Sequence, residues 1–488
     1  MSFKEKALKG IAWFAFKDVT MRIITLITIF FLAHLLDPSQ FGLFSLSLVA
    51  LAFLEIFADQ GLEQALVQRK DVEKLHFTTS LWVMLIVNSI LILITLASAG
   101  MIASAFNEPE LEPILRWLSL SFIFFAVQAV PSAILRRQLA FRKIALVSTV
   151  SALISGAVGI FMAFSGFGVW SLVVQRLSNM GVNTFLIAVI AKWLPGAGIS
   201  RKHFMQLFSF GIHILGFKFL NFFNRQANHL LIGYFIGTTA LGYYTIAYRI
   251  IVSSTAMIRN VSTVMFPVFS RIQDDVQALR EHYFMSSQLV LVIAFPVFFG
   301  ISATAPELVK VFFGLNWMPS IPVMQVLSFI GIVHSFNGIN MAVISALGKP
   351  DWNLKANILN VITNTILFLI LVHWGITAIA TGFVVRGWLL ALPVVTWLAY
   401  RLICFEKKQL MRVVLIPFVS ALVMAITVSL IRFGFNQWLG AGPVVILSIT
   451  IPMGAASYTG IMYILAPELF SKIKETFVSL VVDRRMAR

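Results

Sequence analysis

Charged residues and cysteine are scarce in this 488-residue chain. Only 12% of the residues are charged, and the single cysteine, Cys404, excludes an intramolecular disulfide. The eight histidines are scattered and occur in no HExxH motif, and no CxxC motif is present, so the sequence contains no recognisable metal site. Redox and metal chemistry are therefore not indicated, and we expect no cofactor.

Acidic residues are scarcer than basic ones, at 20 against 37, which gives a formal net charge of +17. Hydrophobic residues make up 59% of the chain, and the mean hydropathy is +0.91. A soluble domain is about 25% charged and about 45–50% apolar. The composition therefore predicts an all-α polytopic membrane protein.

Apolar runs long enough to cross a bilayer recur along the whole chain. A crossing needs about 20 predominantly apolar residues. By this criterion the sequence predicts fourteen transmembrane helices, near 10–36, 41–67, 79–106, 113–135, 143–165, 167–193, 204–236, 241–269, 283–304, 320–346, 354–374, 376–402, 412–433 and 441–466.

The basic residues alternate between the connections. Both termini and every second loop together hold 26 Lys and Arg, whereas the other loops hold only Arg116, Lys310 and Arg432. Because Lys and Arg collect in cytoplasmic loops, we expect both termini in the cytoplasm. The positive charge is dispersed over short loops rather than gathered in one patch, so nucleic-acid binding is not indicated.

The second half of the chain restates the first. A Gly- and Pro-rich connection, "WLPGAGISRKHF", follows the sixth span, and "LLDPSQFGLFSL" (35–46) matches "FIGTTALGYYTI" (235–246) at an offset of 200, with Gly42 over Gly242. Transporters are commonly built from two six-helix repeats with a site between them. We therefore predict an N-lobe (1–196), a C-lobe (197–403) in parallel pseudo-repeat, and two further helices with a cytoplasmic tail (404–488).

Several segments resemble a known family. "GIAWFAFKDVTMR", "FADQGLEQALVQR", "YYTIAYRI", "FPVFSRIQ" and "ALGKPDWNLK" are similar to bacterial polysaccharide exporters of the Wzx type, in the superfamily that includes multidrug extruders and lipid II flippases. The resemblance implies flipping of an undecaprenyl-pyrophosphate-linked oligosaccharide across the bacterial inner membrane by alternating access, for lipopolysaccharide, capsule or exopolysaccharide synthesis. It also implies work beside a polysaccharide polymerase and a chain-length regulator.

Charges within the first two predicted helices indicate a gate or an ion-coupling site. An antiparallel hairpin brings Arg22 level with Glu55, and Lys17 and Asp18 level with Asp59. One interpretation is a self-neutralising ion-paired network, since intramembrane charges normally pair. The other is coupling to a proton or Na⁺, because Glu55 and Asp59 share a helix face and repel each other.

The cations of the predicted second lobe have no intramembrane acid among them. Some could snorkel or bond helix carbonyls, but the set favours a cavity that receives an anion, because arginine's planar fork suits phosphate oxygens. The predicted pyrophosphate-binding residues are Lys218, Arg225, Arg249, Arg259 and Arg386, with Arg176 of the first lobe.

Amide side chains recur in the same lobe at helical spacing. They are either sugar-binding residues or interhelical hydrogen-bonding residues, and the sequence does not decide between the two. The predicted sugar-binding residues are Asn221, Asn224, Asn337, Asn340, Asn357, Asn360 and Asn364.

Two alternatives belong to other classes. A cation-coupled multidrug extruder would export cationic cargo, which a cationic cavity opposes, and such extruders usually have twelve spans. Lipid II flippases resemble the chain more closely in having fourteen spans, although their important arginines are expected in the first lobe. A membrane glycosyltransferase or polymerase would need a large outer loop or an acidic metal motif, and no outer loop exceeds about 16 residues. We therefore expect a transporter of membrane lipids and not an enzyme.

Overall fold

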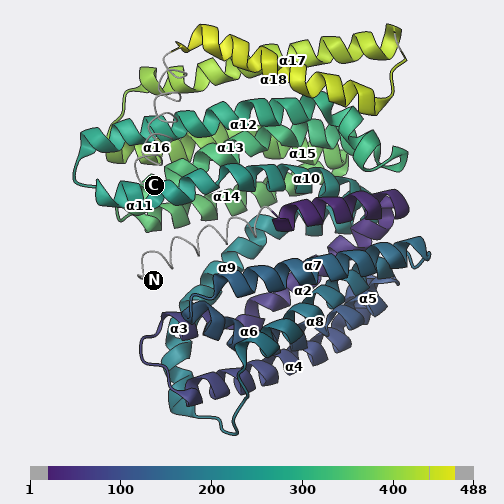
Figure 1. Cartoon of the computed structure of the whole chain (residues 1–488), viewed down its shortest axis with the longest axis vertical. Coiled ribbons are helices and arrows are strands. Elements are labelled where there is room, and N and C mark those ends of the chain that lie inside the picture. The colour runs from purple at the N-terminus through teal and green to yellow at the C-terminus, as the bar shows by residue number, and fades with distance from the viewer. Residues whose placement is uncertain (1–19, 439, 468–488) are drawn as a thin grey trace, which may run out of the picture. The chain divides into compact units, whose positions relative to one another are not determined.

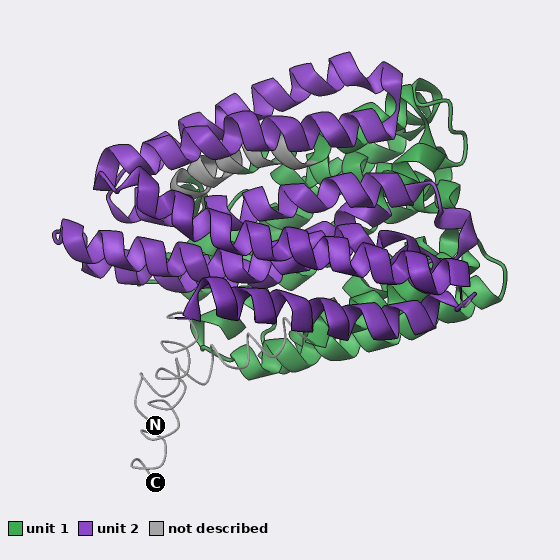
Figure 2. Cartoon of the chain, turned by 90° about the horizontal axis from the view of Figure 1, so that it is seen from above, with its two compact units in different colours: residues 1–245 green, residues 246–488 purple. Residues whose placement is uncertain are grey.

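The computed structural model describes residues 20–438 and 440–467, apart from twelve side chains at 209–215, 217, 220, 221, 224 and 225. Every regular element among these residues is a helix (Figure 1). The contacts divide the chain into two compact units, residues 1–245 and 246–488 (Figure 2). The predicted lobe boundary at 196/197 stays a prediction.

The first unit contains the helix Thr20–Leu35, the beginning of α10 and eight further helices. Their bounds are α2 (Pro38–Asp59), α3 (Leu62–Gln68), α4 (Lys74–Ala105), α5 (Leu111–Leu118), α6 (Ser121–Arg137), α7 (Phe141–Phe164), α8 (Trp170–Ala191) and α9 (Arg201–Phe235).

The second unit begins inside α10 (Thr238–Ile258) and continues to the end of the chain. Its other helices are α11 (Asn260–Arg271), α12 (Val276–Phe312), α13 (Ser320–Ala346), α14 (Pro350–Leu371), α15 (Ile376–Arg386), α16 (Leu392–Ile403), α17 (Lys407–Trp438) and α18 (Pro443–Leu465), with short turns η1 (Leu315–Trp317), η2 (Val372–Trp374) and η3 (Gly387–Ala391).

Eleven helical segments of the described residues are long and apolar enough to cross a membrane. The prediction of an all-helical, multi-pass membrane protein is therefore confirmed. The count of fourteen is not, because the first predicted span is described only from Thr20, and 204–236 and 241–269 form helices that are not among the eleven.

Several predicted spans are broken by irregular turns. The predicted helix 41–67 is interrupted by Gln60 and Gly61, whose φ angles of 49° and 70° are left-handed. Glycine adopts this conformation without a Cβ penalty, which explains Gly61 at this position. The break separates α2 from α3 and brings Asp59 to the carboxyl end of a helix.

Side chains from α3, α4, α6 and α9 form one apolar core of the first unit. Leu62 and Leu66 are fully buried there with Met84 and Val130, and Leu207 joins them from α9. The guanidinium of Arg137 closes the carboxyl end of α3 by donating to the carbonyl oxygens of residues 66, 67, 69 and 70 at 2.5–3.3 Å. The first turns of α9 are thereby packed on α3, α4 and α6.

In the second unit α12 packs against α13, α17 and α18. The Phe298 ring lies so close to Gly331 that a Cβ on this glycine would be 2.2 Å from it, so glycine permits the close approach of α12 and α13. A π-helical turn, η3, follows Arg386 and separates α15 from α16. Such turns are frequent at functional sites.

Candidate functional site

Asp59 and Lys218 form a close ion pair between two helices of the first unit. Asp59 is the last residue of α2, and its side chain is only 4% exposed. Lys218 belongs to α9, and its Nζ lies 2.5 Å from Asp59 Oδ2. The other carboxylate oxygen, Oδ1, is buried and accepts no hydrogen bond from the described residues. The prediction that Lys218 is an unpaired cation is therefore wrong, because α9 packs against α2 and brings its ammonium to Asp59.

Glu55 lies one turn earlier on α2 and meets Arg176 of α8. The distance between Arg176 Nη2 and Glu55 Oε1 is 3.3 Å, and both side chains are about two-fifths exposed. Arg176 was predicted as part of the anion site, yet in this structure it pairs with Glu55, a residue of the predicted gate. Arg22 lies in the helix Thr20–Leu35, and its predicted pairing with Glu55 stays a prediction.

Lys17 and Asp18 lie outside the described residues, so their roles in the predicted gate stay predictions. The same holds for the side chains of Arg225, Asn221 and Asn224, although all three residues lie in helix α9.

Glu63 was missed by the sequence reasoning. It lies in α3, four residues after Asp59, and its carboxylate is 3.4 Å from Arg136. Burial raises the pKa of the Glu63 carboxyl above its usual 4.5, and Arg136 opposes this increase. The spacing of four in Glu55, Asp59 and Glu63 could have revealed it, since all three were within the predicted second span.

The helix end beside Asp59 is held by an amide. Asn88 of α4 donates through Nδ2 to the carbonyl oxygens of Ala58 at 3.0 Å and of Met84 at 2.8 Å. The carboxyl end of a helix carries partial negative charge, which is unfavourable for a carboxylate and favourable for a cation. The ammonium of Lys218 therefore offsets both the Asp59 charge and the end of α2.

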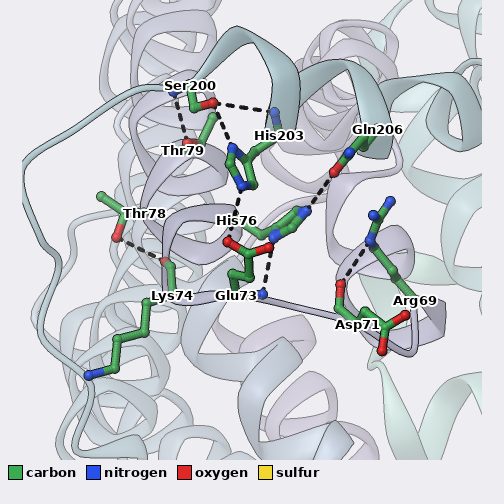
Figure 3. Close-up of polar contacts among 10 residues, drawn as sticks. All are labelled: Arg69, Asp71, Glu73, Lys74, His76, Thr78, Thr79, Ser200, His203 and Gln206. Carbon is green, nitrogen blue, oxygen red and sulfur yellow. Dashed lines mark hydrogen bonds and ion pairs between the residues drawn. The ribbon is translucent and has the colours of Figure 1, made fainter.

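A second polar cluster joins the start of α9 to the start of α4, and sequence reasoning missed it (Figure 3). The buried His76 contacts Gln206 through Nε2 at 3.0 Å, and its Nδ1 accepts from the backbone of Glu73 at 3.1 Å. His203 reaches Ser200 at 2.6 Å and Glu73 at 3.4 Å, and packs edge-on against the His76 ring.

The connection that precedes α9, residues 192–200, is also hydrogen-bonded to α4. Ser200 donates its backbone N–H to Thr79 at 3.1 Å, and the Trp82 indole donates to the Gly196 carbonyl oxygen at 3.2 Å. These bonds fix the end of the 192–200 connection against α4. Only the pairing of residues about 130 positions apart creates this cluster, so no local sequence signal could have found it.

The guanidinium of Arg386 in the second unit is held by three hydrogen bonds. Its guanidinium donates to Asn360 Oδ1 at 2.8 Å, to the Asn360 carbonyl oxygen at 3.0 Å and to Thr363 Oγ1 at 3.2 Å. All these partners are neutral and belong to α14. The structure thus brings together one predicted anion-binding residue and one predicted sugar-binding residue.

Arg249 is half-buried and Arg259 is exposed at the junction of α10 and α11. Within residues 20–438 and 440–467, neither forms an ion pair with a carboxylate, and the same is true of Arg386. Among the described residues, these three arginines therefore have no carboxylate that offsets their charge, whereas Glu307 of α12 is paired with Arg432.

The remaining predicted sugar-binding residues differ in their surroundings. Asn340 is fully buried, accepts from Tyr283 at 2.7 Å and donates to Thr396 at 3.1 Å, so in this structure it joins helices. Asn337 and Asn364 each have a buried carbonyl oxygen that accepts no bond from the described residues. Asn357 is half-buried.

Comparison with known proteins places these features in a family context. The sequence profile described as "Polysaccharide biosynthesis protein" matches residues 31–322. The lipopolysaccharide biosynthesis protein WzxC of Escherichia coli (strain K12) is 28% identical over 404 residues, which cover 82% of this chain and 81% of WzxC. The succinoglycan biosynthesis transport protein ExoT of Rhizobium meliloti (strain 1021) is 26% identical over 323 residues, which cover 66% of this chain and 65% of ExoT.

The fold is similar to that of a solved transporter. The lipid II flippase MurJ in its inward closed conformation superposes with a TM-score of 0.77, covering 94% of this chain and 99% of MurJ. The sequence identity is 15%, so this likeness concerns the fold alone.

Proposed function

The chain belongs to the polysaccharide biosynthesis protein family, and from this premise we propose that it is a flippase for a lipid-linked oligosaccharide. The resemblance to polysaccharide exporters that the sequence predicted is confirmed by the family match and by the similarity to WzxC and ExoT. The chain is thus a transporter and not an enzyme.

The proposed cargo is an undecaprenyl-pyrophosphate-linked oligosaccharide repeat unit for cell-surface polysaccharide synthesis. It moves from the cytoplasmic to the outer leaflet of the bacterial inner membrane, with both termini of the protein in the cytoplasm. The headgroup occupies a cavity between two lobes that rock, while the polyprenyl tail stays in lipid.

The uneven distribution of uncompensated charge carries this proposal. In the first unit Glu55, Asp59 and Glu63 each meet a cation, whereas Arg249, Arg259 and Arg386 of the second unit meet no carboxylate among the described residues. A charged side chain inside a membrane is energetically unfavourable unless it pairs with an opposite charge or is hydrated. A diphosphate supplies such a partner, and guanidinium groups bind its oxygens with charge-assisted bonds.

The ion pairs of the first unit support a role in gating or coupling. Asp59 and Glu55 can exchange their present partners for a proton or Na⁺ when Lys218 or Arg176 moves away, so a cation gradient could drive the cycle. Partners of the protein would be the polymerase and the chain-length regulator that use and control the exported unit.

The proposal is tested in proteoliposomes. The purified protein is reconstituted with a fluorescent undecaprenyl-pyrophosphate oligosaccharide, and its exposure to an impermeant outside reagent is followed with and without an imposed proton, Na⁺ or voltage gradient. We expect protein-dependent movement of this lipid. Transport of a cationic dye without movement of the lipid would instead favour a multidrug extruder, and movement of lipid II alone would favour a peptidoglycan-precursor flippase.

A further inference from the structure

The first turns of α2 and α10 meet through their backbones. A Cβ on Gly42 would lie 1.7 Å from the Thr238 carbonyl oxygen, and a Cβ on Gly242 would lie 1.9 Å from the Pro38 carbonyl oxygen. Real Cβ atoms do not approach an oxygen below 3.0 Å. Only glycine therefore fits at both positions of this crossing.

The two contacts are copies of each other. Residues 38 and 238 are separated by 200 positions, as are Gly42 and Gly242, and this is the offset of the predicted internal repeat. Gly42 meets residue 238 while Gly242 meets residue 38, which is the reciprocity of a contact across a two-fold axis. The pseudo-two-fold axis of the repeat therefore passes between the two glycines.

Further contacts surround the same ends of the helices. Thr238 donates its hydroxyl to Glu108 Oε1 at 2.7 Å from the connection between α4 and α5, and a Cβ on Gly233 would be 3.0 Å from Leu46. The distribution of basic residues predicts that this end of the helices faces outside. The crossing thus joins predicted halves of the transporter at their outer ends.

The depth of the crossing in the membrane distinguishes a gate, which has to open during transport, from a pivot, about which the two lobes would rotate while staying in contact. Gly42 and Gly242 each lie four residues after the first residue of their helix, which is about 6 Å at 1.5 Å per residue. The middle of a bilayer whose apolar core is about 30 Å thick would be reached about ten residues into a helix. A contact so near the outer surface has to break when the cavity opens outward.

We propose that Gly42 and Gly242 are positioning residues of the transport cycle, whose backbone contact closes the outer end of the path and separates in the outward-open state. The inference rests on the proposed function. Because backbone meets backbone at the two glycines, this part of the contact consists of weak interactions, and its separation would also break the Thr238–Glu108 hydrogen bond.

Cross-linking tests the proposal directly. Ser39→Cys and Thr239→Cys, on a Cys404→Ser background, place thiols at repeat-equivalent positions beside the crossing, and a short reducible cross-linker joins them. We expect cross-linking to reduce lipid flipping at least tenfold and reductant to restore it. The control pair Glu112→Cys and Arg116→Cys lies on one turn of α5, so its cross-link should leave flipping unchanged.

Two results would overturn the proposal. If the 39–239 cross-link forms and flipping continues at the uncross-linked rate, the crossing stays closed throughout the cycle and is packing or a pivot. If mass analysis shows that no cross-link forms, the contact itself is wrong.

A distance measurement separates this proposal from the proposed function. Spin labels at the same two cysteines should give a short and a long distance, and Gly42→Ala and Gly242→Ala should each raise the ratio of long to short about tenfold. Gly100→Ala is the control, because its Cβ would meet only ordinary contacts with Glu112. Two distances with this response support the gate even if the protein moves another lipid, whereas a single unchanging distance contradicts it.

Discussion

The partner of Asp59 is the clearest residue-level finding. The sequence predicted this carboxylate within a helix over 41–67, whereas it ends α2, and its partner Lys218 is 159 residues away. The sequence predicted a shared face for Glu55 and Asp59 from their spacing of four. It could not predict which cations of other helices reach that face, because such pairing depends on tertiary packing.

Removing one member of this pair should destabilise the protein more than removing both. Asp59→Asn leaves the ammonium of Lys218 beside the end of α2, and Lys218→Met leaves a buried carboxylate. We expect a coupling free energy of about 1–2 kcal/mol from a double-mutant cycle, reduced by the partial exposure of Lys218.

Unfolding of the four proteins in one detergent measures this coupling. The control cycle uses Asp351 and Lys355, an exposed pair at 3.9 Å on α14, which should couple by less than about 0.5 kcal/mol. Additive effects of Asp59→Asn and Lys218→Met would show that the pair contributes nothing to stability.

Glu63 predicts a specific pH dependence. Because burial raises the pKa of its carboxyl above 4.5, the folded protein binds this proton more tightly than the unfolded chain does. Its contribution to stability is therefore full below the unfolded pKa, near 4.5, and is lost as the pH rises through the folded pKa. Glu63→Gln removes this titration.

The Tm of Glu63→Gln minus that of the wild type should therefore increase with pH from about 4.5 upward. Thermal unfolding at a series of pH values in one detergent measures the difference. Glu281→Gln is the control, because Glu281 is exposed on α12, and its Tm difference should be flat. A flat difference for Glu63→Gln as well would mean that its pKa is not raised.

At the scale of elements, sequence predicts the spans better than their breaks. The predicted helix 320–346 coincides with α13, because Pro319 precedes it and Gly348, with a left-handed φ of 71°, and Pro350 follow it. The predicted helix 41–67 missed the break at Gln60–Gly61, since a glycine in an apolar run can equally lie within a helix. The π-helical turn η3 had no local signal.

Gly61→Ala should weaken the break between α2 and α3. Gly61 has φ of 70°, where an alanine Cβ costs about 1–2 kcal/mol. We expect a lower Tm and a weaker Asp59–Lys218 coupling in the same double-mutant cycle. Gly460→Ala, on α18 with open space around its Cβ, should leave the Tm unchanged or raise it. Equal Tm changes in both variants would argue against strain at Gly61.

For the whole molecule, the charges within the helices bear more on the proposed function than the net charge does. The net charge of +17 reflects mostly loops, yet the balance within the helices distinguishes the two units. The sequence predicted the excess of cations in the second half but counted Lys218 among them. Because Lys218 pairs with Asp59, the remaining predicted cations of the second half are all arginines, the side chains that bind diphosphate best.

We propose that the second unit recognises a diphosphate-linked headgroup. The most direct measurement compares flipping of two fluorescent lipids with the same oligosaccharide and the same polyprenyl chain, one linked through diphosphate and one through an uncharged ether. Wild-type protein is assayed beside Arg259→Gln and the control Lys355→Gln, whose side chain is exposed. We predict rapid flipping of the diphosphate lipid alone, at least tenfold slower flipping by Arg259→Gln, and no change in Lys355→Gln. Equal flipping of both lipids by the wild type, with Arg259→Gln unimpaired, would contradict recognition of the diphosphate by the second unit.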